Sequence, residues 1–275
     1  MDPLFEFIDS HKDEPMFIWF GPMLPHTPLD APYKYRKYYE DRDISQSSKD
    51  YYANISWWDD GVGQLMDYVE SKGLLEDTLF IYLSDNGWEQ DANVEYWYPE
   101  ALADYDSEYL TGGYDGKGSL YDLGLRTPIM FYWKGRLEHG VNERSLVSSA
   151  DLMPTILDIA GADIPEGLPG YSLRPLLDGS GEVDERAELV AYTDNRRSAE
   201  SEMGVPAEGY AVRTHTHHFF WYADSDETRL YDVSLDPRGK LDLSEDRPDL
   251  VERFKQVVAD WKESVGMTTR LEIHE

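Results

Sequence analysis

The sequence TLFIYLSDNG, Thr78–Gly87, is the stretch that decides the fold. Its apolar part, Leu79–Leu83, has the length and aromatic-rich composition of a strand buried on both faces. The strand ends at Ser84–Gly87, where Asp85 and Asn86 stand side by side. Open α/β sheets bind ligands beyond the carboxyl ends of their strands, and these two side chains are oxygen donors suited to a hard divalent cation. The same residues favour an Asx turn that merely closes the strand, so both interpretations stay open.

The stretch before this strand predicts a helix over Ser48–Gly73. Ser47 or Ser48 is suited to cap its start, and Gly73 is suited to the position just past its end. Asn54-Ile55-Ser56 matches a glycosylation sequon, but inside a helix we interpret it as a chance match. The apolar stripe of the helix recurs every three or four residues and consists of Tyr51, Ile55, Trp58, Val62, Leu65 and Val69.

A second buried strand is predicted at Met16–Phe20, with sequence MFIWF. Two strands joined by a long helix form a β-α-β unit, which predicts a parallel sheet. His26 follows the first strand between Pro25 and Pro28, in the sequence PHTP. The flanking prolines restrict the backbone around His26, which favours a pre-positioned imidazole. A histidine at such a place is nevertheless more often a surface or structural residue.

A long segment rich in acidic and aromatic residues, Trp88–Tyr114, separates the SDNG strand from a glycine-rich sequence. Loops of this size in compact domains tend to be lids or binding loops, so we expect this one to contact substrate. The glycine-rich sequence is no phosphate loop, because Thr111 stands five positions before Gly116, and Gly118 follows Lys117. Lys117 is either a solvated loop residue or a point charge that meets an anion.

Composition excludes several functions. The net charge of −30 is spread along the 275 residues and argues against nucleic acid as a partner. No apolar run approaches the roughly 20 residues of a membrane span, and the acidic amino terminus is unlike a signal peptide. We therefore expect no membrane partner and leave the compartment open. The absence of cysteine excludes disulfides, thiolate metal sites and a Cys nucleophile within this sequence.

Five motifs in order resemble the carboxyl-terminal half of a sulfatase, the arylsulfatase-type family within the alkaline phosphatase superfamily. They are PHTP, SDNG, GKGSLYDLGLRTP (Gly116–Pro128), SSADLMPTILDIAG (Ser148–Gly161), and a tail of short strands before a helix from Pro248 to about Val265. The resemblance implies an α/β fold: part of an alkaline-phosphatase-like mixed sheet sandwiched by helices, plus a small carboxyl-terminal antiparallel sheet with a packed helix. It places the catalytic-domain part at residues 1–180 and the small subdomain at 181–275.

The resemblance also implies the roles of four residues. Asp85 and Asn86 match two ligands of a Ca²⁺ (or Mg²⁺) ion, and His26 and Lys117 match residues that contact the sulfate group and assist departure of the alcohol. These roles are chemically coherent, because a cation and a lysine stabilise charge on the bridging oxygen while a histidine donates a proton.

Other polar residues are expected to be structural. Asp122 and Arg126 align with a family Glu and Arg that we interpret as structural, and Asp151 is expected to cap the Ser149–Gly161 helix. Three histidines near the start of a tail strand are expected to be exposed on an edge strand and not to bind metal: His215, His217 and His218.

The sequence departs from the family in what it lacks. The family's Asp-Asp pair, its Lys-x-His motif and its Cys- or Ser-x-Pro-Ser-Arg nucleophile sequence are all missing here. One carboxylate and one amide hold a cation weakly. We therefore expect a sulfuric ester hydrolase that is inactive alone, is incompletely liganded to its metal, and needs a complementary amino-terminal half. The chain also begins as if within a helix, which favours a fragment that exposes an apolar edge and associates with itself.

Two further interpretations remain. One is a phosphate or phosphonate ester hydrolase of the same superfamily. The other is a non-catalytic homologue that binds a glycan or a partner chain. A sulfated small molecule or glycan is the expected substrate class. The net negative charge opposes a sulfated polymer unless a local basic patch forms from Lys34, Arg36, Lys37, Arg42 and Lys117.

Overall fold

The structure is a computed structural model that describes the chain except residues 88–116, 118, 181–185, 195–207, 238 and 268–275. The chain divides into two compact units. The described part of the first lies in Met1–Leu83 and Pro128–Glu138, and that of the second lies in Ser84–Trp88, Tyr114–Thr127 and His139–Glu275. The boundary between catalytic part and subdomain at residue 180 stays a prediction.

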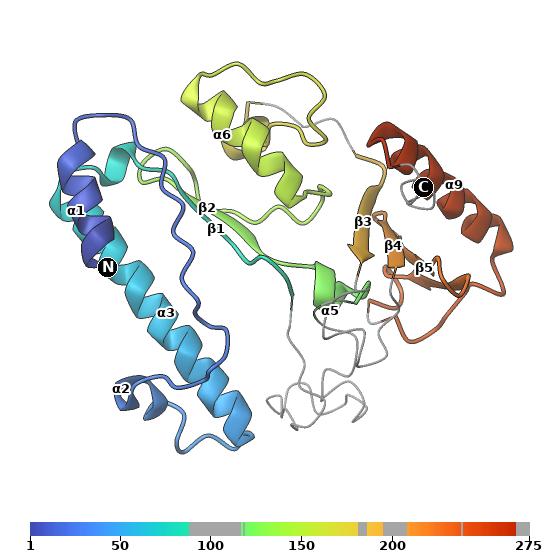
Figure 1. Cartoon of the computed structure of the whole chain (residues 1–275), viewed down its shortest axis with the longest axis horizontal. Helices are drawn as coiled ribbons and strands as arrows, with labels where there is room; N and C mark the ends of the chain where they lie inside the picture. Colours follow the sequence, from blue (N-terminus) through green and yellow to red (C-terminus); the bar gives the residue numbers. More distant parts are fainter. Residues whose placement is uncertain (88–116, 118, 181–185, 195–207, 238, 268–275) are drawn as a thin grey trace, which may run out of the picture. The chain divides into compact units, whose positions relative to one another are not determined.

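The first unit is built on one long helix (Figure 1). Its elements are α1 (Asp2–His11), α2 (Tyr33–Arg36), α3 (Gln46–Ser71), the 3₁₀ turn η1 (Leu75–Asp77), β1 (Phe80–Leu83) and β2 (Ile129–Tyr132). Ile8 of α1 packs with Val69 and Leu75 in a buried cluster. A second cluster joins Ala53 of α3 to Ala31 and Tyr35.

The ends of α3 follow from its local sequence. Ser45 caps the start, because its Oγ accepts a hydrogen bond from the Ser48 backbone N–H at 3.2 Å. The expected cap at Ser47 or Ser48 is therefore wrong by two or three positions, since neighbouring serines are chemically equivalent as caps. Gly73 has φ 73°, and the prediction of a left-handed glycine just past the helix is confirmed.

The sheet of the first unit differs from the predicted β-α-β arrangement. β1 pairs antiparallel with β2, with Phe80 opposite Tyr132 and Leu83 opposite Ile129. Residues 16–20 are not in a strand. They alternate, with Phe17 and Trp19 exposed at 69% and 80% while Met16 and Ile18 pack inward. A strand needs a hydrogen-bonded neighbour, and none of the described residues supplies one to this segment.

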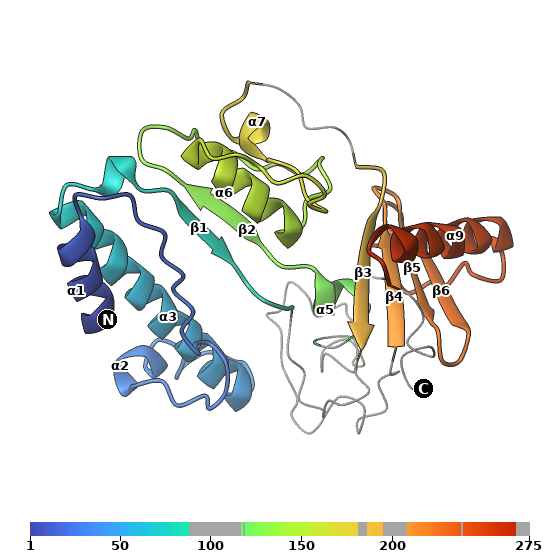
Figure 2. The same ribbon diagram turned by 45° about the horizontal axis from the view of Figure 1, so that its top comes forward.

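The second unit contains a four-stranded antiparallel sheet covered by a helix (Figure 2). Its strands, in the order β3-β4-β5-β6, are Leu189–Asp194, Glu208–Arg213, His217–Tyr222 and Glu227–Asp232. Its helical elements are α5 (Asp122–Leu125), η3 (Ser149–Asp151), α6 (Leu152–Ala160), α7 (Arg174–Leu177) and α9 (Pro248–Ser264). The expected small sheet with a packed carboxyl-terminal helix is what this unit shows.

Side-chain alternation buries both faces of this sheet. Tyr210, Val212 and Phe219 face α9 and pack with Phe254. Their neighbours Ala211 and Phe220 face the other way, in a cluster with Leu120. β5 is thus an inner strand, and the expectation of exposed histidines on an edge strand is wrong for His218, which is 4% exposed.

The described chain is a mixed α/β structure with antiparallel sheets, so the predicted α/β fold class is confirmed. None of its described helices combines the length and apolarity that crossing a membrane would take.

Candidate functional site

The turn that follows β1 is held by its own polar groups. The Ser84 hydroxyl donates to the Asn86 carbonyl at 2.9 Å, and Asn86 Nδ2 donates to the Gly87 carbonyl at 2.8 Å. The Gly87 N–H donates to the carbonyl of Gly124 in α5, at 2.9 Å. The SDNG turn is thereby tied to the GKGSLYDLGLRTP segment.

This geometry leaves two oxygen donors available. Asp85 is exposed, and no described residue makes a hydrogen bond or ion pair with its carboxylate. Because Asn86 uses its amide nitrogen within the turn, its Oδ1 stays without a partner among the described residues. A carboxylate and an amide oxygen suit a hard cation that takes six or more oxygen ligands, so they fit part of such a shell. No group of three or more His, Cys, Asp or Glu forms such a site within the described ranges.

Lys117 and its surroundings belong to the second unit. The side chain is half-buried, and its neighbours on both sides, residues 116 and 118, lie outside the described residues. The long segment Trp88–Tyr114, expected to contact substrate, also lies outside them. The anion-contacting role of Lys117 therefore stays a prediction from the resemblance.

Asp122 anchors the segment that follows Lys117 in the sequence. Its Oδ1 lies 3.1 Å from Nδ1 of the buried His218 and 3.7 Å from Nε of Arg213. Burial alone would raise the pKa of the Asp122 carboxyl, but the His218 hydrogen bond and the charges of His218, Arg213 and Arg126 outweigh it, so this pKa is lowered. These contacts agree with the structural role expected of Asp122.

His26 lies in the first unit, in an exposed part of the proline loop. Its Nδ1 lies 2.9 Å from the Thr27 carbonyl oxygen and 3.2 Å from the Thr27 hydroxyl oxygen. The carbonyl can only accept, whereas the hydroxyl can donate or accept, so these contacts hold the ring without fixing its tautomer.

The structure therefore joins Asp85 and Asn86 in one turn and ties that turn to α5, whereas His26 is described within the other unit. Sequence reasoning missed two residues: Asn54, which bonds to the His26 loop, and His218, which contacts Asp122. Asn54 lies under the His26 loop, although we interpreted its sequon as a chance match. The apolar alternation of β5 could have identified His218 as inward-facing, because it shares a face with Phe220.

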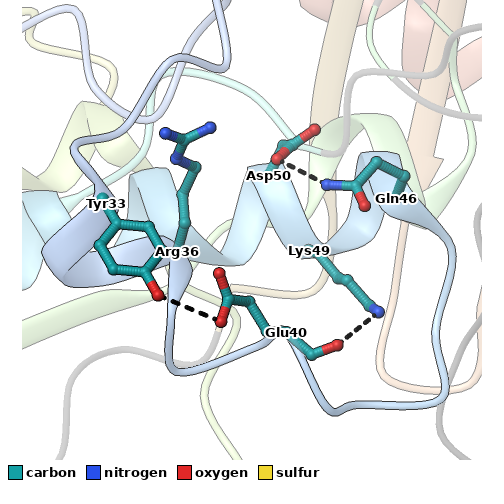
Figure 3. Close-up of a pocket in the computed structure, with 6 residues that line it drawn as sticks. All are labelled: Tyr33, Arg36, Glu40, Gln46, Lys49 and Asp50. Atoms are coloured by element: carbon teal, nitrogen blue, oxygen red, sulfur yellow. Dashed lines mark hydrogen bonds between the residues drawn. The ribbon is translucent and has the colours of Figure 1, made fainter.

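Two residues of the basic patch considered above, Lys34 and Arg36, lie beside carboxylates in the first unit. Lys34 pairs with Asp60 at 3.2 Å. Arg36 lines a surface depression whose two cations are matched by two carboxylates (Figure 3). The six lining residues are Tyr33, Arg36, Glu40, Gln46, Lys49 and Asp50. Such a charge balance does not favour a polyanion.

Two models of known protein families match this chain. Residues 1–162 match the family model described as Sulfatase, and residues 111–264 match that described as N-sulphoglucosamine sulphohydrolase, C-terminal. The chain belongs to the sulfatase family. The resemblance inferred from the five motifs is thereby confirmed.

Curated sulfatases are similar over most of this chain. It is 25% identical over 226 residues to N-acetylglucosamine-6-O-sulfatase of Bacteroides thetaiotaomicron, covering 80% of the chain and 37% of that relative. It is 32% identical over 232 residues to human arylsulfatase A, covering 72% of the chain and 40% of that relative. The chain thus spans less than half the length of these two sulfatases.

Solved structures extend the likeness to the fold. Ps i-CgsB in complex with k-i-k-neocarrahexaose matches with a TM-score of 0.74 and 22% identity, over 96% of this chain and 54% of that one. A phosphonate monoester hydrolase from Silicibacter pomeroyi matches with a TM-score of 0.60 and 21% identity, over 78% and 40%. The sulfatase fold accounts for nearly the whole chain.

Proposed function

We propose that this chain supplies part of the active site of a sulfuric ester hydrolase, which converts a sulfate ester and water to an alcohol and sulfate. The observation that carries the proposal is the turn after β1. There Asp85 and Asn86 keep a carboxylate and an amide oxygen unengaged by any described residue, in a chain of the sulfatase family.

Asp85 and Asn86 would hold a Ca²⁺ or Mg²⁺ ion, and when bound that ion stabilises negative charge on the ester oxygens. His26, in the exposed proline loop, donates a proton to the departing alcohol oxygen. Lys117 meets a sulfate oxygen as a point charge. Asp122 holds the segment that carries Lys117 in place.

Hydrolysis requires a nucleophile, and this sequence contains neither cysteine nor a Ser-x-Pro-x-Arg sequence. We therefore propose that the chain is inactive alone and works with a complementary amino-terminal half of a sulfatase. The apolar segment 16–20 supports this, because it is extended, half exposed and unpaired among the described residues. An added strand would satisfy its backbone groups.

A sulfated sugar is the proposed substrate class. Support comes from the names of a matched N-acetylglucosamine-6-O-sulfatase and of a matched structure with a carrahexaose. A phosphonate or phosphate ester is the second candidate, favoured by the matched phosphonate monoester hydrolase. Both substrates carry anionic oxygens that the same cation and lysine recognise.

The test is an assay of the full chain with 4-nitrophenyl sulfate and 4-nitrophenyl phosphonate esters, alone and with the amino-terminal half encoded upstream. A Cys-x-Pro-Ser-Arg sequence in that half and sulfatase activity only in the pair would support the proposal. Preference for the phosphonate would favour the second candidate. Turnover by the lone chain would contradict the proposal that a partner half is needed.

The metal role of Asp85 has its own prediction. We expect weak Ca²⁺ binding by the lone chain, with a Kd on the order of 10⁻³ M, and its loss in Asp85→Ala. Calorimetry in 150 mM KCl measures this and suppresses diffuse binding to the acidic surface. Glu252→Ala removes an exposed carboxylate of α9 and is the matched control. Equal loss in both variants would mean that binding reflects net charge alone.

A further inference from the structure

Asn54 is a fully buried polar side chain in the middle of α3, with an exposed fraction of 0%. All of its described side-chain hydrogen bonds reach the loop around His26. Its Oδ1 accepts from the Ala31 N–H at 3.0 Å, and its Nδ2 donates to the Pro28 carbonyl at 3.2 Å and the Pro25 carbonyl at 3.5 Å. His26 lies between the two carbonyls that this amide holds.

The loop around His26 depends on a side-chain donor such as the Asn54 amide because the loop is rich in proline. Proline residues 25, 28 and 32 have no backbone N–H, which limits how the loop can bond to itself. The His26 N–H donates to the Met23 carbonyl at 2.8 Å, which shapes the turn but does not attach it to a helix. Attachment comes from Asn54, beside the close packing of Ala31 against Ala53.

A carboxamide suits this place better than other side chains of its size. It both donates and accepts, so it satisfies carbonyls and an N–H at once. Asparagine in a helix interior is less favourable than alanine, and burying an unsatisfied amide carries a further penalty. The bonds to the loop offset both costs. The same burial and bonding leave the Asn54 amide inaccessible to a glycan in the folded chain.

We propose that Asn54 is the positioning residue of His26: it fixes the loop backbone on both sides of the histidine and so sets where the imidazole stands. The role of His26 in ester hydrolysis rests on the proposed function. The positioning itself is a property of this chain and is measurable without substrate.

The experiment follows the ring signals of the seven histidines in the full chain, labelled with ¹³C and ¹⁵N at histidine. His26→Gln assigns the His26 signal. Asn54→Ala should shift or split that signal and leave the other six in place. Asn54→Asp keeps the acceptor for Ala31 and loses both donations, so it should perturb the same signal.

The matched control is Ser56→Ala, which removes the 2.7 Å hydrogen bond between Ser56 and Tyr39 on the same helix. It should leave the His26 signal unchanged. A folded Asn54→Ala with an unmoved His26 signal would overturn the proposal, and so would an equal response to Ser56→Ala.

Wild-type chain supplies a second measurement if the Asn54 variants do not fold. The Asn54 side-chain amide protons should exchange slowly with solvent, because the amide is buried and bonded. Rapid exchange would overturn the proposal. With the completed enzyme, Asn54→Ala should lower kcat by about tenfold to a hundredfold, as displaced catalytic groups do, with KM less affected. A complex without activity would count against the proposed function. The positioning role of Asn54 would then be tested by the His26 ring signal alone.

Discussion

Asp122 shows how one residue connects two parts of the second unit. It begins α5, the short helix whose Gly124 carbonyl receives the SDNG turn, and its carboxylate reaches His218 and Arg213 on the inner strands of the sheet. The His218 ring is buried, and its Nε2 makes no hydrogen bond within the described structure. The contact with Asp122 therefore satisfies Nδ1 of this ring and leaves Nε2 without a partner among the described residues.

Replacing Asp122 should change how stability depends on pH. Its pKa is below the ordinary value of 3.8, so the fold favours the ionised carboxylate. That contribution is present above the unfolded pKa and is lost as pH falls from about 4 through the lower folded value. Asp122→Asn should cost about 1–3 kcal/mol at pH 7 and show less of the acid-induced decline.

Urea denaturation at pH 7, 5, 4 and 3 measures this effect. Asp246→Asn is the control, since Asp246 is exposed and has no hydrogen bond or ion pair with a described residue. An Asp122→Asn variant with the acid profile of the wild type would remove the assigned role of the Asp122–His218 pair.

At the scale of elements, the start of the 149–160 helical stretch depends on Asp151. Asp151 stands at the N-cap position of α6, as expected, but its side chain does not bond into that helix. It closes the capping box of η3, whose cap is Ser148, by accepting from the Ser148 N–H at 2.7 Å. The Asp151 side chain is fully buried, and it also accepts from the Tyr171 N–H at 3.1 Å and from both terminal nitrogens of Arg186. One carboxylate thus joins three chain segments.

Arg186→Ala should destabilise the second unit by about 3–5 kcal/mol, because it leaves a buried carboxylate without its partner charge. The lost contacts are the 2.7 and 3.0 Å bonds to Asp151. Arg247→Ala removes the exposed pair with Asp249 at 2.9 Å and should cost no more than about 1 kcal/mol. Thermal and urea unfolding of both variants compares them, and equal costs would mean that Asp151 is solvated once Arg186 is gone.

At the scale of the whole molecule, two properties oppose each other. A net charge of −30 repels other copies of the chain. The segment of residues 16–23 exposes Phe17, Trp19 and Met23, and the backbone of residues 16–20 has no hydrogen-bond partner among the described residues. Large exposed apolar groups of this kind mark an interaction surface, and salt screens the repulsion that keeps copies apart.

We therefore expect the lone chain to associate with itself and to do so more in 500 mM than in 50 mM NaCl. Phe17→Ser with Trp19→Ser should reduce the associated fraction. Leu235→Ser, which removes an exposed apolar side chain of the second unit, should not. Light scattering after size exclusion measures the mass, and a stable, cooperative monomer at both salt concentrations would contradict this expectation.

The sequence by itself determined the features that depend on neighbours along the chain. Its periodicity identified α3, and Gly73 located the end of that helix. Its motif order identified the sulfatase family and, with it, the helix that begins at Pro248. The Asp85–Asn86 pair was also visible, because a polar end to an apolar strand is a local pattern. Local patterns suffice where hydrogen bonds close within a few residues.

Only the tertiary structure decided which distant groups meet. It placed β2 against β1, His218 inside the sheet, Asn54 under the His26 loop and Arg186 on Asp151. The segment MFIWF has strand composition, but a strand is defined by its partner, and the described chain provides none. Each of these outcomes depends on burial and hydrogen bonding between residues far apart in the sequence. A pattern read along one segment carries no information about the segment that will face it.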